Sequence, residues 1–334
     1  MDALSDVLRV VELTGAVYLD GAFSAPWGIR VPADSAVCSA FLPSSERVIS
    51  FHLVTEGECV AHLPHDSGSA LRLSAGEVIV VPQGETHLIG SSTDAAPELM
   101  APLLANQMQQ APGEVMTLAY GGGGAVTGMI CGFLSAQEIW RNPLLSALPR
   151  LFKVDMRGTS ASWLEASLRF ATREAASARA GGAAVLAKLA ELLFVEAVRR
   201  YVDTMPDDRT GWLAGLRDRF VARALTLMHA RPAHPWTVEE LAQRVGMSRS
   251  GLAQRFAELL GMPPMQYLAQ WRLQLAAHHL RTADRPLAVV AENVGYESEA
   301  AFNRAFKREF GMPPATWRRN AGRVPERSKV PKPA

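Results

Sequence analysis

Side chains that can hydrogen-bond to DNA recur on two short stretches near the C-terminus, residues 246–256 and 295–306. Asn and Gln can pair with adenine and Arg with guanine, while Arg, Lys and Ser bind phosphate. The candidate DNA-contacting residues are Ser248, Arg249, Ser250, Ala253, Gln254, Arg255, Ser298, Glu299, Ala300, Asn303, Arg304, Lys307 and Arg318. We assign base contacts to Ser250, Gln254, Glu299 and Asn303, and mainly phosphate contacts to Arg249, Arg255, Arg304, Lys307 and Arg318.

The two stretches are copies of one unit, since each leads to the same tetrapeptide, Gly-Met-Pro-Pro, at residues 261–264 and 311–314. In the first copy Gly246 separates two amphipathic patterns of helical period, and Ser248 is a good N-cap for the second of them. Gly295 occupies the same place in the second copy. Each copy therefore predicts a helix, a tight turn and a second helix, which is the geometry that lays a helix in the major groove.

The segment between the copies predicts a single helix over residues 264–280, because it has helical apolar spacing and no internal Gly or Pro after its first residue. A stiff helix would fix the distance between the two units. Two reading helices held in this way could enter major-groove segments about 34 Å apart.

Residues 212–319 resemble the DNA-binding domain of the AraC/XylS family of transcription regulators. The resemblance rests on Gly-Met-Ser-Arg-Ser at 246–250 and on the glycines, phenylalanines and proline of the second copy, residues 295–314. The chain departs from the pattern at Trp317, where the family often has Tyr, and at Gly251, which weakens a helix. The resemblance implies two helix-turn-helix units that bind double-stranded promoter DNA.

The charge distribution agrees with a nucleic-acid partner for one half of the chain only. Residues 212–334 carry 19 Lys and Arg against 10 Asp and Glu, whereas residues 1–211 carry 15 against 23. A cationic half suits phosphate neutralisation, and an acidic half is repelled from the duplex. The alternative is that the cations only solvate helix faces.

The N-terminal half has the short apolar runs of a β-sandwich or small barrel, separated by turn residues. These runs are residues 28–31, 48–54, 59–63, 70–73, 78–81 and 129–134. Two helices are expected over 163–178 and 183–201, the second with more than one apolar face. Residues 91–128 have the composition of a mobile loop.

Residues 76–87 have the spacing Gly-x5-Pro-x-Gly-x2-His of the second cupin motif, and residues 51–58 resemble the end of the first. The family's His-x-His pair has no counterpart at residues 37–41, so the metal triad is incomplete. Residues 1 to about 200 resemble the cupin sensor domain attached to a subset of AraC-type regulators.

The resemblance makes His52, His87 and Cys131 the ligand or sensor candidates. His87 is either a hydrogen-bonded interior histidine, a ligand-binding group, or a metal ligand together with His52 and Cys131. Cys131, Cys38 or Cys59 could instead sense oxidants, which requires an exposed thiol of lowered pKa. We expect no cofactor.

The predicted fold class is α+β in two domains, a cupin-like β-barrel or sandwich followed by helices and an all-α double helix-turn-helix. The expected divisions are a sensor barrel over 1–135, a helical part with a possible dimerisation role over 136–202, a linker over 203–211, a DNA-binding domain over 212–320 and a disordered basic tail over 321–334.

These patterns predict a sequence-specific transcription regulator, of the activator kind, that reads two adjacent major-groove segments under control of an unknown small-molecule or redox effector. Its expected partners are promoter DNA, a second copy of the chain and RNA polymerase. The alternative is a metal-dependent cupin enzyme with an accessory DNA-binding domain; a DNA-repair fusion with a reactive cysteine has less support, because no cysteine lies in a suitable motif. No apolar run or leader pattern indicates a membrane or export, so we expect a cytoplasmic protein.

Overall fold

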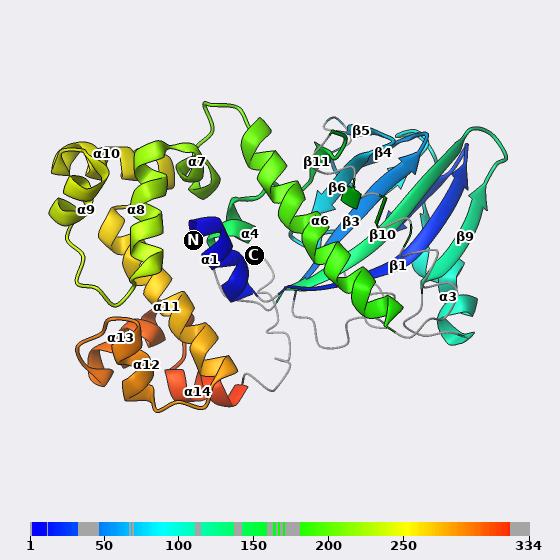
Figure 1. The fold of residues 1–334 in the computed structure, drawn as a ribbon. Helices are drawn as coiled ribbons and strands as arrows, with labels where there is room; N and C mark the ends of the chain where they lie inside the picture. The colour runs from blue at the N-terminus through cyan, green and yellow to red at the C-terminus, as the bar shows by residue number, and fades with distance from the viewer. Residues whose placement is uncertain are drawn as a thin grey trace, which may run out of the picture. The chain divides into compact units, whose positions relative to one another are not determined.

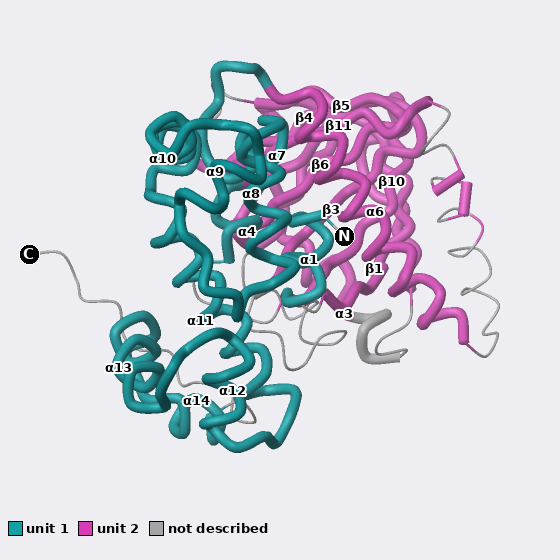
Figure 2. Tube along the Cα trace, turned by 60° about the vertical axis from the view of Figure 1, so that its left-hand side comes forward, with its two compact units in different colours: residues 1–11, 138–147, 206–334 teal, residues 12–137, 148–205 magenta. Residues whose placement is uncertain are grey.

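The computed structural model describes residues 2–11, 13–32, 47–66, 68, 70–110, 115–136, 142–158, 163–164, 166–167, 170 and 181–320. The chain forms two compact units, drawn in different colours in Figure 2. Unit 2 comprises residues 12–137 and 148–205 and is rich in β-strands, and unit 1 comprises residues 1–11, 138–147 and 206–334 and is helical where it is described. The expected α+β class with two domains is confirmed.

Unit 2 is built from two β-sheets (Figure 1). The six-stranded sheet has the order β11-β6-β3-β10-β1-β9 and consists of β1 (Leu13–Ser24), β3 (Arg47–Glu56), β6 (Glu77–Val81), β9 (Met116–Gly121), β10 (Val126–Ala136) and β11 (Phe152–Asp155). The five-stranded sheet has the order β5-β4-β7-β2-β8 and consists of β2 (Gly28–Val31), β4 (Glu58–His62), β5 (Leu71–Ser74), β7 (His87–Gly90) and β8 (Glu98–Leu99). Each predicted strand in this half is present.

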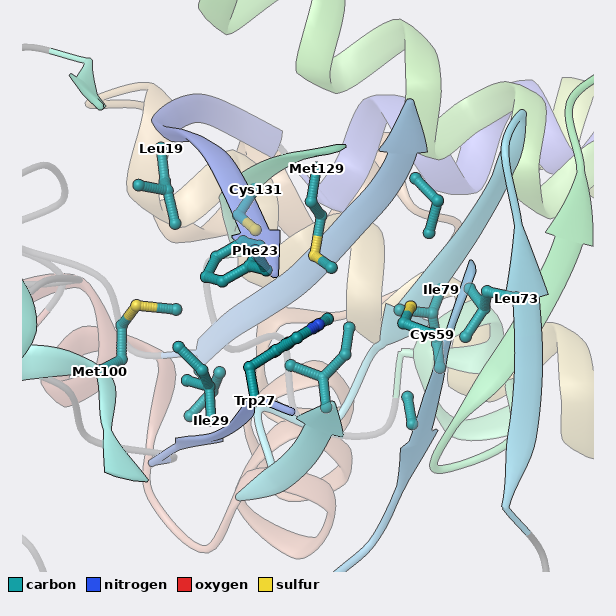
Figure 3. Packing of buried hydrophobic residues seen from close by; sticks show 14 of the residues in the cluster. Leu19, Phe23, Trp27, Ile29, Cys59, Leu73, Ile79, Met100, Met129 and Cys131 are labelled. Carbon is teal, nitrogen blue, oxygen red and sulfur yellow. The ribbon is translucent and has the colours of Figure 1, made fainter. Parts of the chain in front are cut away.

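Side chains from both sheets meet in one apolar cluster inside unit 2 (Figure 3). Successive residues of a strand point to opposite faces of the sheet, so one alternate set of each strand faces this cluster. Buried members come from β1 to β7, β9, β10 and α3 (Met100–Gln110), and include Phe23, Val54, Ile79 and Met129; Trp27, between β1 and β2, is also a member. The Trp27 indole stacks on Phe23 with ring centroids 4.6 Å apart.

Two helices of unit 2 accompany the sheets, α3 (Met100–Gln110) and α6 (Gly182–Thr204). The prediction that residues 91–128 form a loop is wrong, because α3 and β9 lie within that segment. Helix α6 confirms the helix predicted over 183–201. The helix predicted over 163–178 lies almost wholly outside the described residues.

Helix α6 packs on strand β1, and Gly15 is the place where it comes closest. A Cβ atom at Gly15 would lie 2.5 Å from the carbonyl oxygen of Ala187 and 2.8 Å from the Cβ of Ala190. Only a residue without a side chain leaves room for the helix at this point.

Unit 1 is a group of short helices, shown in teal in Figure 2. They are α1 (Ala3–Val11), α4 (Pro143–Ala147), α7 (Trp212–Arg217), α8 (Arg219–Ala230), α9 (Val238–Val245), α10 (Arg249–Leu260), α11 (Pro264–Thr282), α12 (Leu287–Asn293), α13 (Glu299–Phe310) and α14 (Pro314–Asn320). Helix α1 packs against α8 and α11, and α4 packs against α7. Residues 1–11 and 138–147 are therefore grouped with the C-terminal helices, whereas the division drawn from sequence assigns them to the sensor.

Helix α11 connects the two repeated units as a continuous rod of 19 residues, about 28 Å long at 1.5 Å per residue. Its first half contacts the first unit, where the Tyr267 and Phe256 rings meet edge to face. Its second half joins a separate apolar cluster with α12 and α13, in which Phe302 and Phe306 are fully buried. The predicted stiff connector and the predicted phenylalanine stripe are both confirmed.

Among the described residues, no helix combines the length and the apolar character needed to cross a bilayer.

Candidate functional site

The two predicted reading helices are α10 and α13, each the second helix of a helix-turn-helix unit. In the first unit, the Thr237 hydroxyl accepts a hydrogen bond from the Glu240 amide and caps α9, and Gly246 then reverses the chain with φ 81°. In the second unit, Gly295 has φ 87°, and a Cβ atom there would lie 2.8 Å from the Cα of Ala233. Glycine is required at both turns, because this left-handed backbone is strained for other residues.

Two of the predicted DNA-contacting serines hold the starts of these helices. The Ser248 hydroxyl accepts a hydrogen bond from the Gly251 amide at 3.1 Å, and the Ser298 hydroxyl accepts one from the Ala301 amide at 3.2 Å. Both serines are exposed. Each hydroxyl thus uses one of its two lone pairs for N-capping. Its other lone pair and its hydroxyl proton remain available for DNA.

On α10, the polar side chains of the outer face have partners within the protein. Arg249 Nε lies 2.6 Å from Glu239 Oε1, and Gln254 Nε2 donates to Glu258 Oε1 at 2.8 Å. Arg249 and Gln254 are exposed, so both side chains remain open to solvent. Ser250 is also exposed, and Ala253 is half-buried.

Arg255 forms the shortest of these contacts on α10. Its Nε and Nη2 both lie 2.5 Å from Asp218 Oδ2. Asp218 is also the N-cap of α8 and accepts hydrogen bonds from the amides of Phe220 and Val221. Burial raises the pKa of Asp218, but the Arg255 guanidinium and the two amides outweigh it and the pKa is lowered.

On α13, the outer face is more open. Glu299, Ala300, Arg304 and Lys307 are exposed, and Asn303 is half-buried. Arg318 is not on α13 but on the following helix, α14. Its Nη1 lies 3.3 Å from Asp284 Oδ1, and its guanidinium also donates a hydrogen bond to the carbonyl oxygen of Arg285.

The acidic partners of these α10 side chains were not predicted from the sequence. Of the three pairs described for α10, only the uncharged Gln254 and its partner Glu258 are four apart on one helix, the spacing that predicts such a pair. Asp218 and Glu239 lie on other elements than Arg255 and Arg249, so their pairing depends on how the helices pack.

The sensor candidates His52 and His87 form a pair inside unit 2. Their Nε2 atoms are 2.8 Å apart, and both side chains are fully buried. His52 lies on β3 and His87 begins β7, so the pair joins the two sheets. Nδ1 of His87 contacts the carbonyl oxygen of Glu85 at 3.0 Å.

Both histidines are held neutral. Burial lowers the pKa of His87 to about 4, although the hydrogen bond with the Glu85 carbonyl acts in the opposite direction. Burial, followed by the repulsion that two protonated rings would exert on each other, lowers the pKa of His52 well below its usual value. Desolvation disfavours the charged imidazolium, so the pair carries no charge at neutral pH.

A metal ion does not fit the described side chains of this pair. Zinc sites in proteins use at least three side-chain ligands, and no three His, Cys, Asp or Glu side chains among the described residues come together in that way. Cys131 is the cross-strand neighbour of His52 on β10, but it does not complete a ligand set.

The described cysteines are poor candidates for redox sensing. Cys59 is buried, and burial, reinforced by the charges of Glu77 and Glu58, raises the pKa of its thiol to about 12. Cys131 is fully buried. Thiol reactivity requires the thiolate and access to solvent. Cys38 lies outside the described residues.

Two family models match this chain. Residues 2–203 match the Cupin model, and residues 241–320 match a Helix-turn-helix domain model. The first covers α1, α4 and unit 2 as far as residue 203. The second begins at residue 241, within α9, and ends with α14 at residue 320.

Full-length relatives have the same combination. The chain is 31% identical to an AraC-like transcription regulator of Streptomyces antibioticus, covering 96% of this chain and 99% of the relative. It is 30% identical to the HTH-type transcriptional regulator AlkR of Acinetobacter baylyi, over 96% and 100% of the two chains. It is 28% identical to the RCS-specific HTH-type transcriptional activator RclR of Escherichia coli, over 95% and 97%. The chain belongs to the AraC family of DNA-binding transcription regulators, in the group with an N-terminal cupin domain.

Proposed function

We propose that this protein is a sequence-specific transcription activator that reads two adjacent major-groove segments of a promoter and responds to a signal sensed in unit 2. The observation that carries the proposal is the pair of helix-turn-helix units fixed to one rod, α11. A spacing of about 34 Å separates successive major-groove faces, and a rod of about 28 Å is of the size needed to hold two reading helices near that spacing.

In this proposal the contacts divide by side-chain chemistry. Asn303 and Gln254 would make base contacts, and Arg304 and Lys307 would make phosphate contacts. Ser248, Arg249, Ser250, Ala253, Arg255, Ser298, Glu299, Ala300 and Arg318 complete the proposed interface.

A salt-titrated gel shift with DNA from upstream of the protein's own gene tests this assignment. Asn303→Ala should relax the preference at one base pair, at a cost of about 1–3 kcal/mol. Lys307→Ala should weaken binding to all sequences and reduce the salt slope by about 1. If Asn303→Ala keeps the sequence preference of the wild type, Asn303 does not contact a base.

We infer that the functional form is a homodimer with an interface on α6. Val185 and Leu192 are 52% and 47% exposed on this helix, on one side of it, while Leu186, Leu193 and Ala197 face the sheet and are buried. Exposed apolar side chains at helical spacing are typical of a helix that pairs. Sedimentation of Leu192→Glu against the wild type checks this: the variant should shift towards the monomer.

The regulatory signal, in this proposal, is an organic effector rather than an oxidant, because the described cysteines are buried. An enzymatic role has less support, since His52 and His87 bind each other and the full-length relatives are transcription regulators. As an activator the protein would contact RNA polymerase. It would act where the chromosome is, in the cytoplasm.

A further inference from the structure

Two buried nitrogen atoms inside unit 2 have no hydrogen-bond partner among the described residues. They are Nδ1 of His52 and Nε1 of Trp27. His52 is fully buried and Trp27 is 2% exposed. A buried polar group without a partner lowers the stability of the folded state, so such atoms are rare in native interiors unless something else binds them.

Both side chains belong to the interior of the unit. Trp27 is a member of the apolar cluster, as Figure 3 shows. On β3, Val54 is also a member and Val48 packs against it. Since alternate residues of a strand share a face, His52 lies on the same face as these two valines. Its cross-strand neighbours Ile79 and Cys131 belong to the cluster as well.

The hydrogen bonds of the histidine pair determine which nitrogen carries each proton. A carbonyl oxygen only accepts, so His87 must donate from Nδ1 to Glu85. The Nε2 of neutral His87 is then an acceptor, and His52 must donate to it from its own Nε2. The remaining nitrogen of His52, Nδ1, therefore has a free lone pair.

The interior thus presents one acceptor, at His52, and one donor, the indole N–H of Trp27. No Lys or Arg among the described residues is buried, so an anionic group would have no counter-charge there. The cluster also contains Met100, Met116 and Met129, whose flexible side chains can repack around a guest molecule.

We propose that His52 Nδ1 is the recognition point for an uncharged, mainly apolar effector that donates a hydrogen bond from a hydroxyl group. This inference rests on the proposed function, because it names the chemical class of the signal sensed in unit 2.

Three probes with the same ring system test the proposal on the full-length protein. They are 2-naphthol, its methyl ether 2-methoxynaphthalene, and 2-naphthoate, measured by calorimetry at neutral pH. We expect 2-naphthol to bind about three- to tenfold more tightly than the ether, the range of one hydrogen bond. The naphthoate should bind most weakly, because it brings a charge. Equal affinities for the alcohol and the ether, or no binding of the alcohol, would overturn the proposal.

Two substitutions at His52 test the roles of its two nitrogen atoms separately. His52→Asn keeps an acceptor near the position of Nδ1 but loses the contact with His87, and it should retain the preference for the alcohol. His52→Gln keeps a donor near the position of Nε2 but loses the acceptor, and it should lose the preference while still binding the ether. The exposed His65 provides the matched control, His65→Gln, which should behave as wild type. The opposite pattern in the two His52 variants would refute the assignment.

A measurement on the wild-type protein keeps the test independent of the variants' folding. The ¹⁵N spectrum of the histidines should show His52 with a proton on Nε2 and an unprotonated Nδ1, whose shift moves when 2-naphthol is added. A proton on Nδ1 would contradict the proposal. Binding of Zn²⁺ alone to this nitrogen, with no response to the alcohol, would also contradict it and would indicate a metal site.

The same samples are assayed for binding to promoter DNA by gel shift. Specific DNA binding without any alcohol preference would reject this inference and leave the proposed regulator intact. Alcohol binding without specific DNA binding would reject the proposed regulator.

Discussion

Asp218 and Arg255 join two helices of the DNA-binding unit, with Arg255 Nη2 2.5 Å from Asp218 Oδ2. The carboxylate side chain is only 8% exposed, and the guanidinium side chain is 49% exposed. One residue thus caps α8 and holds a cation on the outer face of α10. The start of one helix and the reading face of the other are fixed by the same carboxylate.

Substitution of Asp218 should separate its two roles. Asp218→Ala removes the N-cap and the ion pair, and we expect the free energy of unfolding to fall by about 1–2 kcal/mol. Asp218→Asn keeps a good N-cap and loses only the charge, so the fall should be about 0.5–1 kcal/mol, because Arg255 remains half in solvent. Urea denaturation followed by circular dichroism measures both values. Equal effects of the two substitutions would show that capping contributes nothing.

Glu239 should compete with DNA for Arg249. The two side chains form an exposed ion pair, at 71% and 56% exposure, and such pairs contribute about 0.2–1 kcal/mol. Glu239→Gln should therefore raise the affinity for specific and nonspecific DNA alike, by up to about fivefold, since a free Arg249 reaches phosphate at no cost. Fluorescence anisotropy with labelled duplexes measures this. As a control, Glu239→Gln in an Arg249→Ala background should have a smaller effect, because only the repulsion between the Glu239 carboxylate and the duplex is then removed.

The buried His229 should make the protein sensitive to acid. Its Nε2 lies 2.8 Å from the Tyr267 hydroxyl, and its ring stacks on Trp271 with centroids 3.9 Å apart. Burial lowers the pKa of His229 from 6.5 to about 3. The unfolded chain takes up a proton as the pH falls below 6.5, whereas the folded chain does not until about 3, so stability falls with pH across this window.

This single group should contribute a slope of at most about 1.4 kcal/mol per pH unit. His229→Gln keeps an acceptor for the Tyr267 hydroxyl and should flatten the pH dependence of the free energy of unfolding between 6.5 and about 3. His65→Gln, at an exposed position, should leave the slope as in wild type. An unchanged slope in His229→Gln would mean that His229 is already charged in the folded protein.

The described cysteines should be inert in the native protein. Iodoacetamide at neutral pH should modify neither Cys59 nor Cys131 until urea is added, because both thiols are buried and the pKa of Cys59 is about 12. Peptide mapping by mass spectrometry reports each cysteine separately. Rapid labelling of Cys59 in the folded protein would contradict this prediction and would support Cys59 as an oxidant sensor.

Features of local origin were predicted well from the sequence. Ser248 and Ser298 cap α10 and α13, and the Phe302 and Phe306 stripe is buried, because capping and helical spacing depend only on residues within a few positions. The duplicated unit made the reading helices recognisable before any tertiary contact was known. The strand β6, a continuous apolar run, was found for the same reason.

Strand β1 (Leu13–Ser24) was not among the strands predicted from the sequence, and glycines interrupt its apolar residues. Gly15 serves to admit α6, and the Cβ of a residue at Gly132 on the neighbouring strand would lie 2.2 Å from the Phe51 ring. Likewise β9, which pairs in parallel with β1, falls in a segment of loop-like composition. Such strands depend on partners far away in the chain, and a window of local sequence does not contain them.

The sequence by itself determined the family, the two helix-turn-helix units and the three sensor candidates, since these reside in motifs and periodicities. The tertiary structure alone decided what the candidates do. His52 and His87 are 35 positions apart and on different sheets, and only their packing brings their Nε2 atoms together and leaves one lone pair of His52 facing the interior. The pairing of Arg255 with Asp218 has the same origin. Ion pairs form between groups that are close in space, and these two residues are 37 positions apart in the chain.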